Sequence, residues 1–142
     1  MADRAEDVVL RVFQAVEQRD AQAFADVAHP EIELHWPASL PYGGVFRATD
    51  LGSQAGPSWE ATWTPLQPTK RERCMDPRVV AAAGDEVVVL WHQRGVDRAG
   101  DRFDGEVLGL YRVRDGRLVR AQMFYFDPVA ALDFLDRAFR AG

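Results

Sequence analysis

The chain has 142 residues, of which 47% are hydrophobic and 27% are charged, and its formal net charge is −5. This length and composition are typical of one globular domain, so we expect a single domain over residues 1–142. The negative charge argues against a nucleic-acid partner, which would require a basic face. No apolar run approaches the roughly 18 residues that cross a membrane, and the charged start "MADRAEDVV" is unlike a signal peptide. We therefore expect a cytoplasmic protein with no membrane partner.

Cysteine and histidine give no indication of a disulfide or a metal site. The single cysteine, Cys74, excludes an internal disulfide and any multi-cysteine zinc site. His29, His35 and His92 lack the spacing of a metal-binding motif such as HExxH. We therefore expect neither a metal nor another cofactor. The basic residues are almost all Arg, a bias that with the abundant Ala is typical of a bacterial chain from a GC-rich genome.

Two helices are expected at the start of the chain. Apolar residues at i, i+3, i+4 and i+7 predict an amphipathic helix over residues 4–18. That repeat is formed by Val9, Val12, Phe13 and Val16. Asp20 can cap a second, shorter helix that runs to Ala28, where His29 and Pro30 end it.

The next segment begins with a strand and continues with aromatic residues among Pro and Gly. Residues 31–36, "EIELHW", alternate between polar and apolar, which predicts a strand with Trp36 on its buried face. The following "PASLPYGGVF" is too aromatic for a solvated loop and too rich in Pro and Gly for a helix. We interpret it as the rim and lid of a ligand pocket, with Tyr42 and Phe46 over the mouth.

A broken helix and an extended segment should follow. Thr49 and Ser58 are candidate caps for one broken or two short helices that carry Trp59 and Trp63. The three prolines between residues 65 and 77 favour an extended, edge-like segment.

The second half of the chain predicts a meander of four strands and a closing helix. The strands are expected near residues 79–83, 86–96, 103–113 and 117–126, with turns at Gly84-Asp85 and at residues 114–116. Asp127 and Pro128 are suited to the N-cap and N1 positions of the last helix. This order of elements is typical of an α+β fold with its helices on one face of a curved sheet.

The order of elements, with "LPYGGVFR", "YRVRDGRL" and "FYFDPVAALDFL", resembles the SnoaL-like group over nearly the whole chain. That group belongs to the ketosteroid-isomerase-like and nuclear-transport-factor-like superfamily. The resemblance implies an α+β barrel, in which a cone-shaped, curved antiparallel sheet carries helices on its concave face. It also implies a mostly apolar cavity at the open end and dimerisation through the outer face of the sheet. Because this fold is used by isomerases, cyclases, hydrolases, dehydratases and non-enzymes, the resemblance alone names no reaction.

Strand alternation separates an inner face from an outer one. If residues 114–116 form a three-residue turn, Tyr111 lies opposite Val119, and the inner face carries no charged residue. The outer face keeps an apolar patch that a homodimer would cover. The patch is formed by Leu90, Leu108, Leu110, Phe124 and Phe126.

The uncharged inner face should hold a hydrophobic small molecule. The residues expected to contact it are Trp36, Trp59, Trp63, Trp91, Gln93, Tyr111, Met123 and Tyr125. Gln93 is the most informative of these, because an amide on an apolar face must find hydrogen-bond partners.

A general base is harder to find. By resemblance, Gly109 stands where isomerases of this superfamily carry an inward acid, and no Asp or Glu falls on the predicted inner face. His35 is the remaining candidate base, provided that the break at Pro37 turns it inward, with the Tyr42 hydroxyl opposite. His92 is predicted to face outward, and Asp127 is expected to cap a helix. Two functions stay open: a cofactor-free isomerase or cyclase acting on an aromatic or polycyclic substrate, and a non-catalytic ligand-binding or accessory module with an apolar cavity.

Overall fold

The computed structural model describes residues 4–48 and 56–140. Its helices are α1 (Ala5–Glu17), α2 (Ala21–Val27), α3 (Trp59–Trp63), α4 (Lys70–Arg73) and α5 (Pro128–Arg140), with a 3-10 turn η1 (Thr64–Leu66). Its strands are β1 (Ala28–Trp36), β2 (Gly44–Arg47), β3 (Arg78–Ala83), β4 (Glu86–Val96), β5 (Arg102–Arg114) and β6 (Arg117–Tyr125). Within these described ranges, no helix is long and apolar enough to cross a membrane.

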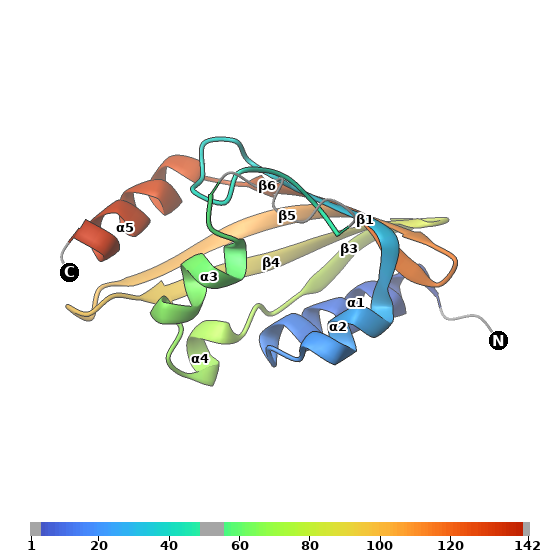
Figure 1. Cartoon of the computed structure of the whole chain (residues 1–142), viewed down its shortest axis with the longest axis horizontal. Helices are drawn as coiled ribbons and strands as arrows, with labels where there is room; N and C mark the ends of the chain where they lie inside the picture. Colours follow the sequence, from blue (N-terminus) through green and yellow to red (C-terminus); the bar gives the residue numbers. More distant parts are fainter. Residues whose placement is uncertain (1–3, 49–55, 141–142) are drawn as a thin grey trace.

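The strands form one curved sheet in the order β2-β1-β6-β5-β4-β3, with the helices gathered along its concave side (Figure 1). This is the expected α+β cone fold. All neighbouring strands are antiparallel except β1 and β6, which run parallel. The sheet is therefore mixed rather than wholly antiparallel. It does not close into a barrel, and β2 and β3 remain its edges.

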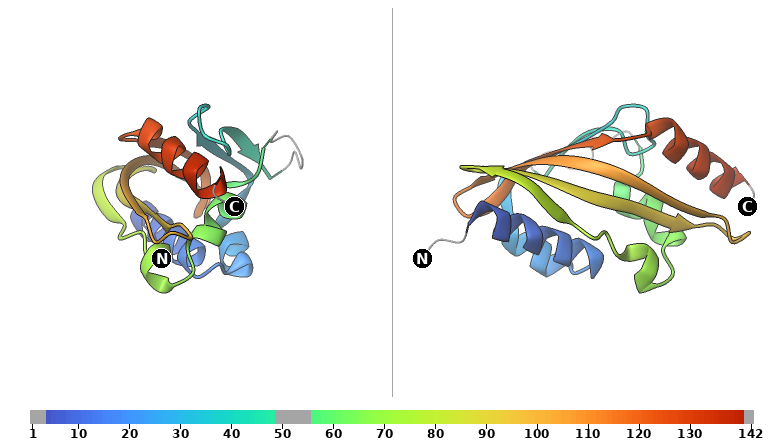
Figure 2. Two further views of the ribbon diagram at one scale, coloured as in Figure 1. Left: turned by 90° about the vertical axis from the view of Figure 1, so that its left-hand side faces the viewer. Right: turned by 180° about the vertical axis from the view of Figure 1, so that it is seen from behind.

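Helices α1 and α2 lie under one half of the sheet, and α5 lies at the opposite end (Figure 2). The apolar stripe of α1 faces the sheet, where Val8, Val9, Val12 and Phe13 are buried. Asp20 caps α2 as expected, its carboxylate accepting a hydrogen bond from the Ala23 N–H at 3.0 Å. Helix α2 ends at Val27, one residue early, because Ala28 already pairs with β6. Pro30, which has no N–H to donate, falls at an irregularity in that pairing.

The hairpin between β5 and β6 differs from the prediction in its turn and register. The turn is the two-residue Asp115-Gly116, both with positive φ (55° and 73°), and Arg114 pairs with Arg117. A bulge after Arg112 then shifts the pairing by one residue, which returns the rest of β6 to the predicted inner and outer faces. Tyr111 therefore pairs with Ala121 rather than with Val119. Leu118, which the three-residue turn would place outside, is buried in the core.

Two further segments differ from the sequence expectation. Residues 44–47 form the edge strand β2, paired with β1, rather than a loop. Residues 64–73 fold into η1 and α4 rather than an extended segment, because Thr69 and Glu72 form a reciprocal capping box. The cap expected at Ser58 is present, with its Oγ accepting from the Ala61 N–H at 3.0 Å, whereas Thr49 lies outside the described residues.

The outer face of the sheet carries exposed apolar side chains. Leu110 and Phe124 on β5 and β6 are 37% and 49% exposed, and Phe126 just beyond β6 is 62% exposed. Leu90 and Leu108 beside them are half-buried.

Candidate functional site

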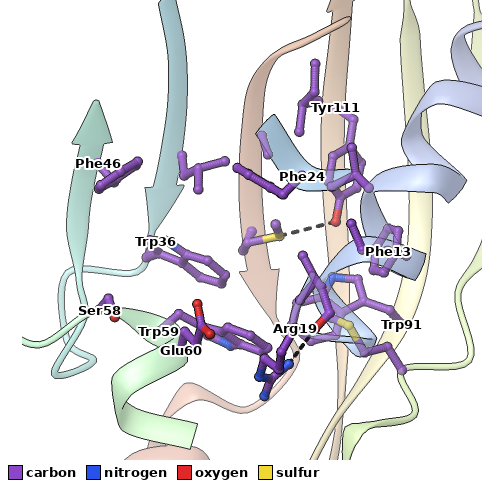
Figure 3. Close-up of a pocket in the computed structure, with 18 of the residues that line it drawn as sticks. Phe13, Arg19, Phe24, Trp36, Phe46, Ser58, Trp59, Glu60, Trp91 and Tyr111 are labelled. Atoms are coloured by element: carbon purple, nitrogen blue, oxygen red, sulfur yellow. Dashed lines mark hydrogen bonds between the residues drawn. The ribbon is translucent and has the colours of Figure 1, made fainter. Parts of the chain in front are cut away.

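A cavity of about 320 Å³ lies between the sheet and helices α1, α2 and α3 (Figure 3). Its lining is mainly apolar and aromatic, with the polar groups few and concentrated on the helical side. The sheet contributes Leu34, Trp36, Phe46, Trp91, Tyr111, Leu118, Ala121 and Met123. The helices and linkers contribute Val12, Phe13, Ala15, Val16, Arg19, Asp20, Ala21, Phe24, Ser58, Trp59, Glu60 and Met75.

Aromatic rings form most of one side of the cavity. Trp36 of β1 and Trp59 of α3 stack with their planes 7° apart and their centroids 6.1 Å apart. Trp91 meets Trp59 edge-on at 6.5 Å, and Phe13 of α1 meets both Trp91 and Tyr111 edge-on. Flat, rigid walls of this kind favour a planar aromatic ligand, because offset stacks and edge contacts are the preferred geometries between rings.

The Tyr111 ring lies over Gly109 on the same strand. A Cβ built on Gly109 would come within 2.5 Å of the Tyr111 hydroxyl oxygen and Cε2. Only glycine therefore lets this ring lie along the sheet. Burial raises the pKa of Tyr111, so its hydroxyl stays protonated at neutral pH. That hydroxyl donates to the Met123 Sδ at 3.5 Å, a weak acceptor.

Trp91, which also lines the cavity, carries a second underused donor. Its side chain is fully buried, and its indole N–H lies near the Tyr111 hydroxyl. No acceptor in the described parts of the chain meets this N–H with hydrogen-bond geometry. A buried N–H without an acceptor costs about 1–3 kcal/mol, so an acceptor atom on a ligand would relieve that cost.

Four of the residues expected at the cavity form a hydrogen-bonded network outside its lining. The Tyr42 and Tyr125 hydroxyls are 2.7 Å apart, and the Trp63 Nε1–H donates to the Tyr42 hydroxyl at 3.1 Å. The Gln93 Oε1 accepts from the Trp59 Nε1–H at 2.6 Å and from the Tyr125 hydroxyl at 3.3 Å. Tyr42, Trp63, Gln93 and Tyr125 thus support the Trp59 wall from behind. Burial raises the pKa of Tyr42 to about 12.

The histidines and Asp127 also lie outside the cavity lining. The His35 Nε2 bonds to the Glu33 Oε1 at 2.9 Å, and the pKa of Glu33 is lowered by this hydrogen bond. The His92 Nδ1 is 2.7 Å from the Asp104 Oδ1. Asp127 caps α5 as expected, accepting from the Ala130 N–H at 3.0 Å. His29 accepts through its Nδ1 from the Glu31 N–H.

The mouth of the cavity holds charged residues that the sequence reasoning missed. Arg19 follows α1, Asp20 caps α2 and Glu60 lies on α3. Arg19 has a φ of 53°, and Arg19 N–H and Asp20 N–H donate to the carbonyls of Val16 and Ala15. This pattern is a Schellman motif with Arg19 at C′, where glycine is the usual residue. The non-glycine residue in a left-handed cap is a feature that the sequence alone does not display.

Residues 9–121 match the model of the SnoaL-like domain. TerC, solved in a co-crystal with polyporic acid, is 19% identical over 93% of this chain and 98% of its own, with a TM-score of 0.74. An NTF2-like protein from Burkholderia thailandensis is 21% identical over 91% of this chain and 95% of its own, with a TM-score of 0.67.

IdmH from Streptomyces antibioticus, a proposed polyketide cyclase, is 16% identical over 94% of this chain and 98% of its own, with a TM-score of 0.67. A search of curated protein sequences finds no match. At these identities the structural neighbours establish the fold alone. The family match spans most of the chain, and the protein belongs to the SnoaL-like domain family, with the fold of NTF2-like proteins.

Proposed function

We propose that the protein binds a planar, hydrophobic aromatic molecule in the cavity between α1, α2 and the sheet. The observation that carries this proposal is a cavity of about 320 Å³ with tryptophan walls and one buried indole N–H, that of Trp91, which has no acceptor within residues 4–48 and 56–140. Cavities of about 300–1,000 Å³ with apolar walls and few polar groups are typical small-molecule sites. The co-crystal of TerC with polyporic acid and the polyketide-cyclase description of IdmH support a ligand of this class.

The donors fix where the ligand's oxygen would lie. Both the Trp91 N–H and the Tyr111 hydroxyl are buried, and among the described residues the Tyr111 hydroxyl donates to the weak Met123 sulfur while the Trp91 N–H meets no acceptor with hydrogen-bond geometry. A carbonyl or phenolic oxygen placed between them would accept from both. The ligand is therefore an oxygenated aromatic molecule rather than a plain hydrocarbon.

A fluorescence titration tests this proposal, because Trp36, Trp59 and Trp91 all line the cavity. We expect 2-naphthol to quench the tryptophan emission and to bind more tightly than naphthalene. Replacing Ala121, whose side chain faces the cavity from β6, with Leu should fill the space and abolish binding. The same substitution at exposed Ala61 on α3 should leave binding unchanged. If neither 2-naphthol nor naphthalene binds to the folded wild-type protein, the proposal is refuted.

Cofactor-free isomerase or cyclase chemistry is the second candidate function. The Trp91 and Tyr111 donors favour it, since they would stabilise an enolate oxygen if the bound molecule lost a proton. In the expected acid–base pair, the His35 Nε2 is bonded to Glu33, and the Tyr42 hydroxyl is bonded to Tyr125 and Trp63. Deuterium uptake by bound 2-tetralone, followed by NMR in D₂O, distinguishes the two functions. Uptake that requires the protein supports catalysis, and its absence with bound ligand supports the binding module.

A further inference from the structure

Arg19 is a cation at the mouth of the cavity. Its guanidinium lies over the Trp59 ring, with Cζ 5.2 Å from the ring centroid (Figure 3). Within the described residues, no carboxylate oxygen lies within the 4.0 Å of a salt bridge to it. Burial lowers the pKa of Arg19, while the charge of Glu60 raises it. The guanidinium is thus partly removed from water and only distantly neutralised.

The side chain is held in place by neutral acceptors. Its Nη1–H donates to the Val16 carbonyl at 2.6 Å, its Nε–H donates to the Thr64 hydroxyl at 3.3 Å, and its Nη2–H donates to the Gln67 Oε1. Gln67 is itself buried and donates to the Arg94 carbonyl at 2.8 Å. These bonds use three of the five guanidinium N–H groups, so two remain for another acceptor.

The backbone adds an independent observation. Arg19 adopts the left-handed conformation at C′ of α1, at a φ of 53°, where glycine would be free of steric cost. A larger residue in such a position costs about 1–2 kcal/mol and points to a requirement for its side chain. The neutral partners alone do not require a charge there, because the amide of a neutral Gln could also donate to one of them.

We propose that Arg19 recognises an acidic group of the ligand, so that the cavity selects aromatic acids, such as an aromatic carboxylate or an ionised phenol, over neutral aromatics. This inference rests on the proposed function. The aromatic rings would occupy the space between Trp36, Trp91 and Phe13. The acidic oxygen, which is a different atom from the oxygen that accepts from Trp91 and Tyr111, would face the free N–H groups of Arg19. Glu60, exposed on α3, and Asp20, committed to capping α2, line the same mouth and limit how much negative charge it accepts.

The test compares 2-naphthoate with 2-naphthamide, which share a ring system and differ in charge. In the wild-type protein we expect naphthoate to bind about 10- to 100-fold more tightly, as a charged hydrogen bond implies. Arg19→Gly, which relieves the left-handed cap, and Arg19→Gln should both remove this preference while leaving naphthamide affinity within about threefold, the scale of a minor perturbation. Arg71→Gln, at an exposed position on α4, is the matched control and should keep the preference.

The outcomes separate this inference from the function on which it rests. If naphthamide binds and naphthoate gains nothing, or if both Arg19 variants keep the preference, the role of Arg19 is refuted while the aromatic site stands. If the Arg19 variants lose both ligands equally, Arg19 only supports the Trp59 wall, and the proposal is again refuted. If neither molecule binds to the wild-type protein, the proposed function fails as well. Circular dichroism confirms that each variant is folded.

Discussion

Replacing Gly109 with Ala should push the Tyr111 ring away from the sheet and destabilise the protein. A Cβ at residue 109 would stand 2.5 Å from the Tyr111 hydroxyl oxygen, about 1 Å short of an ordinary contact of 3.4 Å. The φ of Gly109 is not in the left-handed region, so Ala adds no backbone strain there. Overpacking of this size costs about 1–3 kcal/mol, and the lower entropy of the unfolded Ala chain offsets about 0.5–1 kcal/mol. The difference between these two ranges is a net loss of about 0–2.5 kcal/mol, and we expect a value near the middle, about 1 kcal/mol.

Urea unfolding followed by tryptophan fluorescence measures this loss, and a double-mutant cycle identifies its cause. In a Tyr111→Val background the side chain ends too soon to lie over residue 109, so Gly109→Ala should be neutral or slightly stabilising. The coupling between the two sites should then be about 1–3 kcal/mol. The displaced ring would also enter the cavity and weaken 2-naphthol binding. If the changes in the free energy of unfolding caused by the two substitutions add to within about 0.5 kcal/mol, a collision between the new Cβ and Tyr111 is refuted as the cause.

Two further predictions concern the outer face. The Arg94 guanidinium donates to the carboxylates of Asp76 at 2.8 Å and Asp104 at 3.0 Å. The hydrogen bond from Arg94 lowers the pKa of Asp76. Burial acts to raise the pKa of Asp104, but the hydrogen bonds from His92 and Arg94 outweigh it, so that pKa is lowered too. A carboxylate with a depressed pKa stabilises the fold above its unfolded pKa of about 3.9, and this stabilisation is lost as pH falls through the folded value. Arg94→Leu should therefore lower the free energy of unfolding by about 1 kcal/mol at pH 7, a figure discounted for the exposure of both carboxylates. The loss should become progressively smaller below pH 4. Urea unfolding from pH 7 to pH 3 measures this, and a cost that does not vary with pH would show that Arg94 acts through packing. We also propose that the apolar patch of Leu90, Leu108, Leu110, Phe124 and Phe126 forms a homodimer interface, so Leu110→Glu should halve the mass measured by light scattering; an unchanged dimer would place the interface elsewhere.

Strand alternation in the sequence is enough to predict the inner face, although the predicted register was wrong. The actual turn, Asp115-Gly116, is one residue shorter than expected, and that change alone would have exchanged the faces of β6. The bulge after Arg112 shifts the pairing back, so Ala121, Met123 and Tyr125 still face inward. Two errors therefore cancelled for most of β6, and only Leu118, which lies before the bulge, was assigned to the wrong face.

Alternation fixes the face of a strand but not the depth of a residue along the cavity. Trp91 and Gln93 share one face of β4, yet Trp91 lines the cavity while Gln93 lies behind Trp59. Which of them lines the cavity depends on where α3 packs, and α3 follows a segment of the sequence that carries no clear periodicity. For the same reason the sequence placed Tyr42 at the mouth, whereas its ring is fully buried.

The charged mouth could not be predicted, because it is formed by a local backbone feature and a distant contact. From the sequence alone, Arg19 is indistinguishable from an ordinary solvated residue at the end of an amphipathic helix. Its direction is set by the left-handed C′ conformation and by Gln67, a residue far along the chain. Neither cause leaves a periodic pattern or a motif.

The parallel pairing of β1 with β6 determines when the cavity wall can form during folding. The two strands come from opposite ends of the chain, and β2 is attached to the sheet only through β1. Contacts this far apart in sequence are slow to form, because the entropy of closing the intervening loop is lost before the pairing compensates it. Trp36 and Phe46 would therefore dock last, onto a meander of β3 to β6 that is already paired. A ligand that needs the finished wall would slow unfolding and leave the rate of folding unchanged.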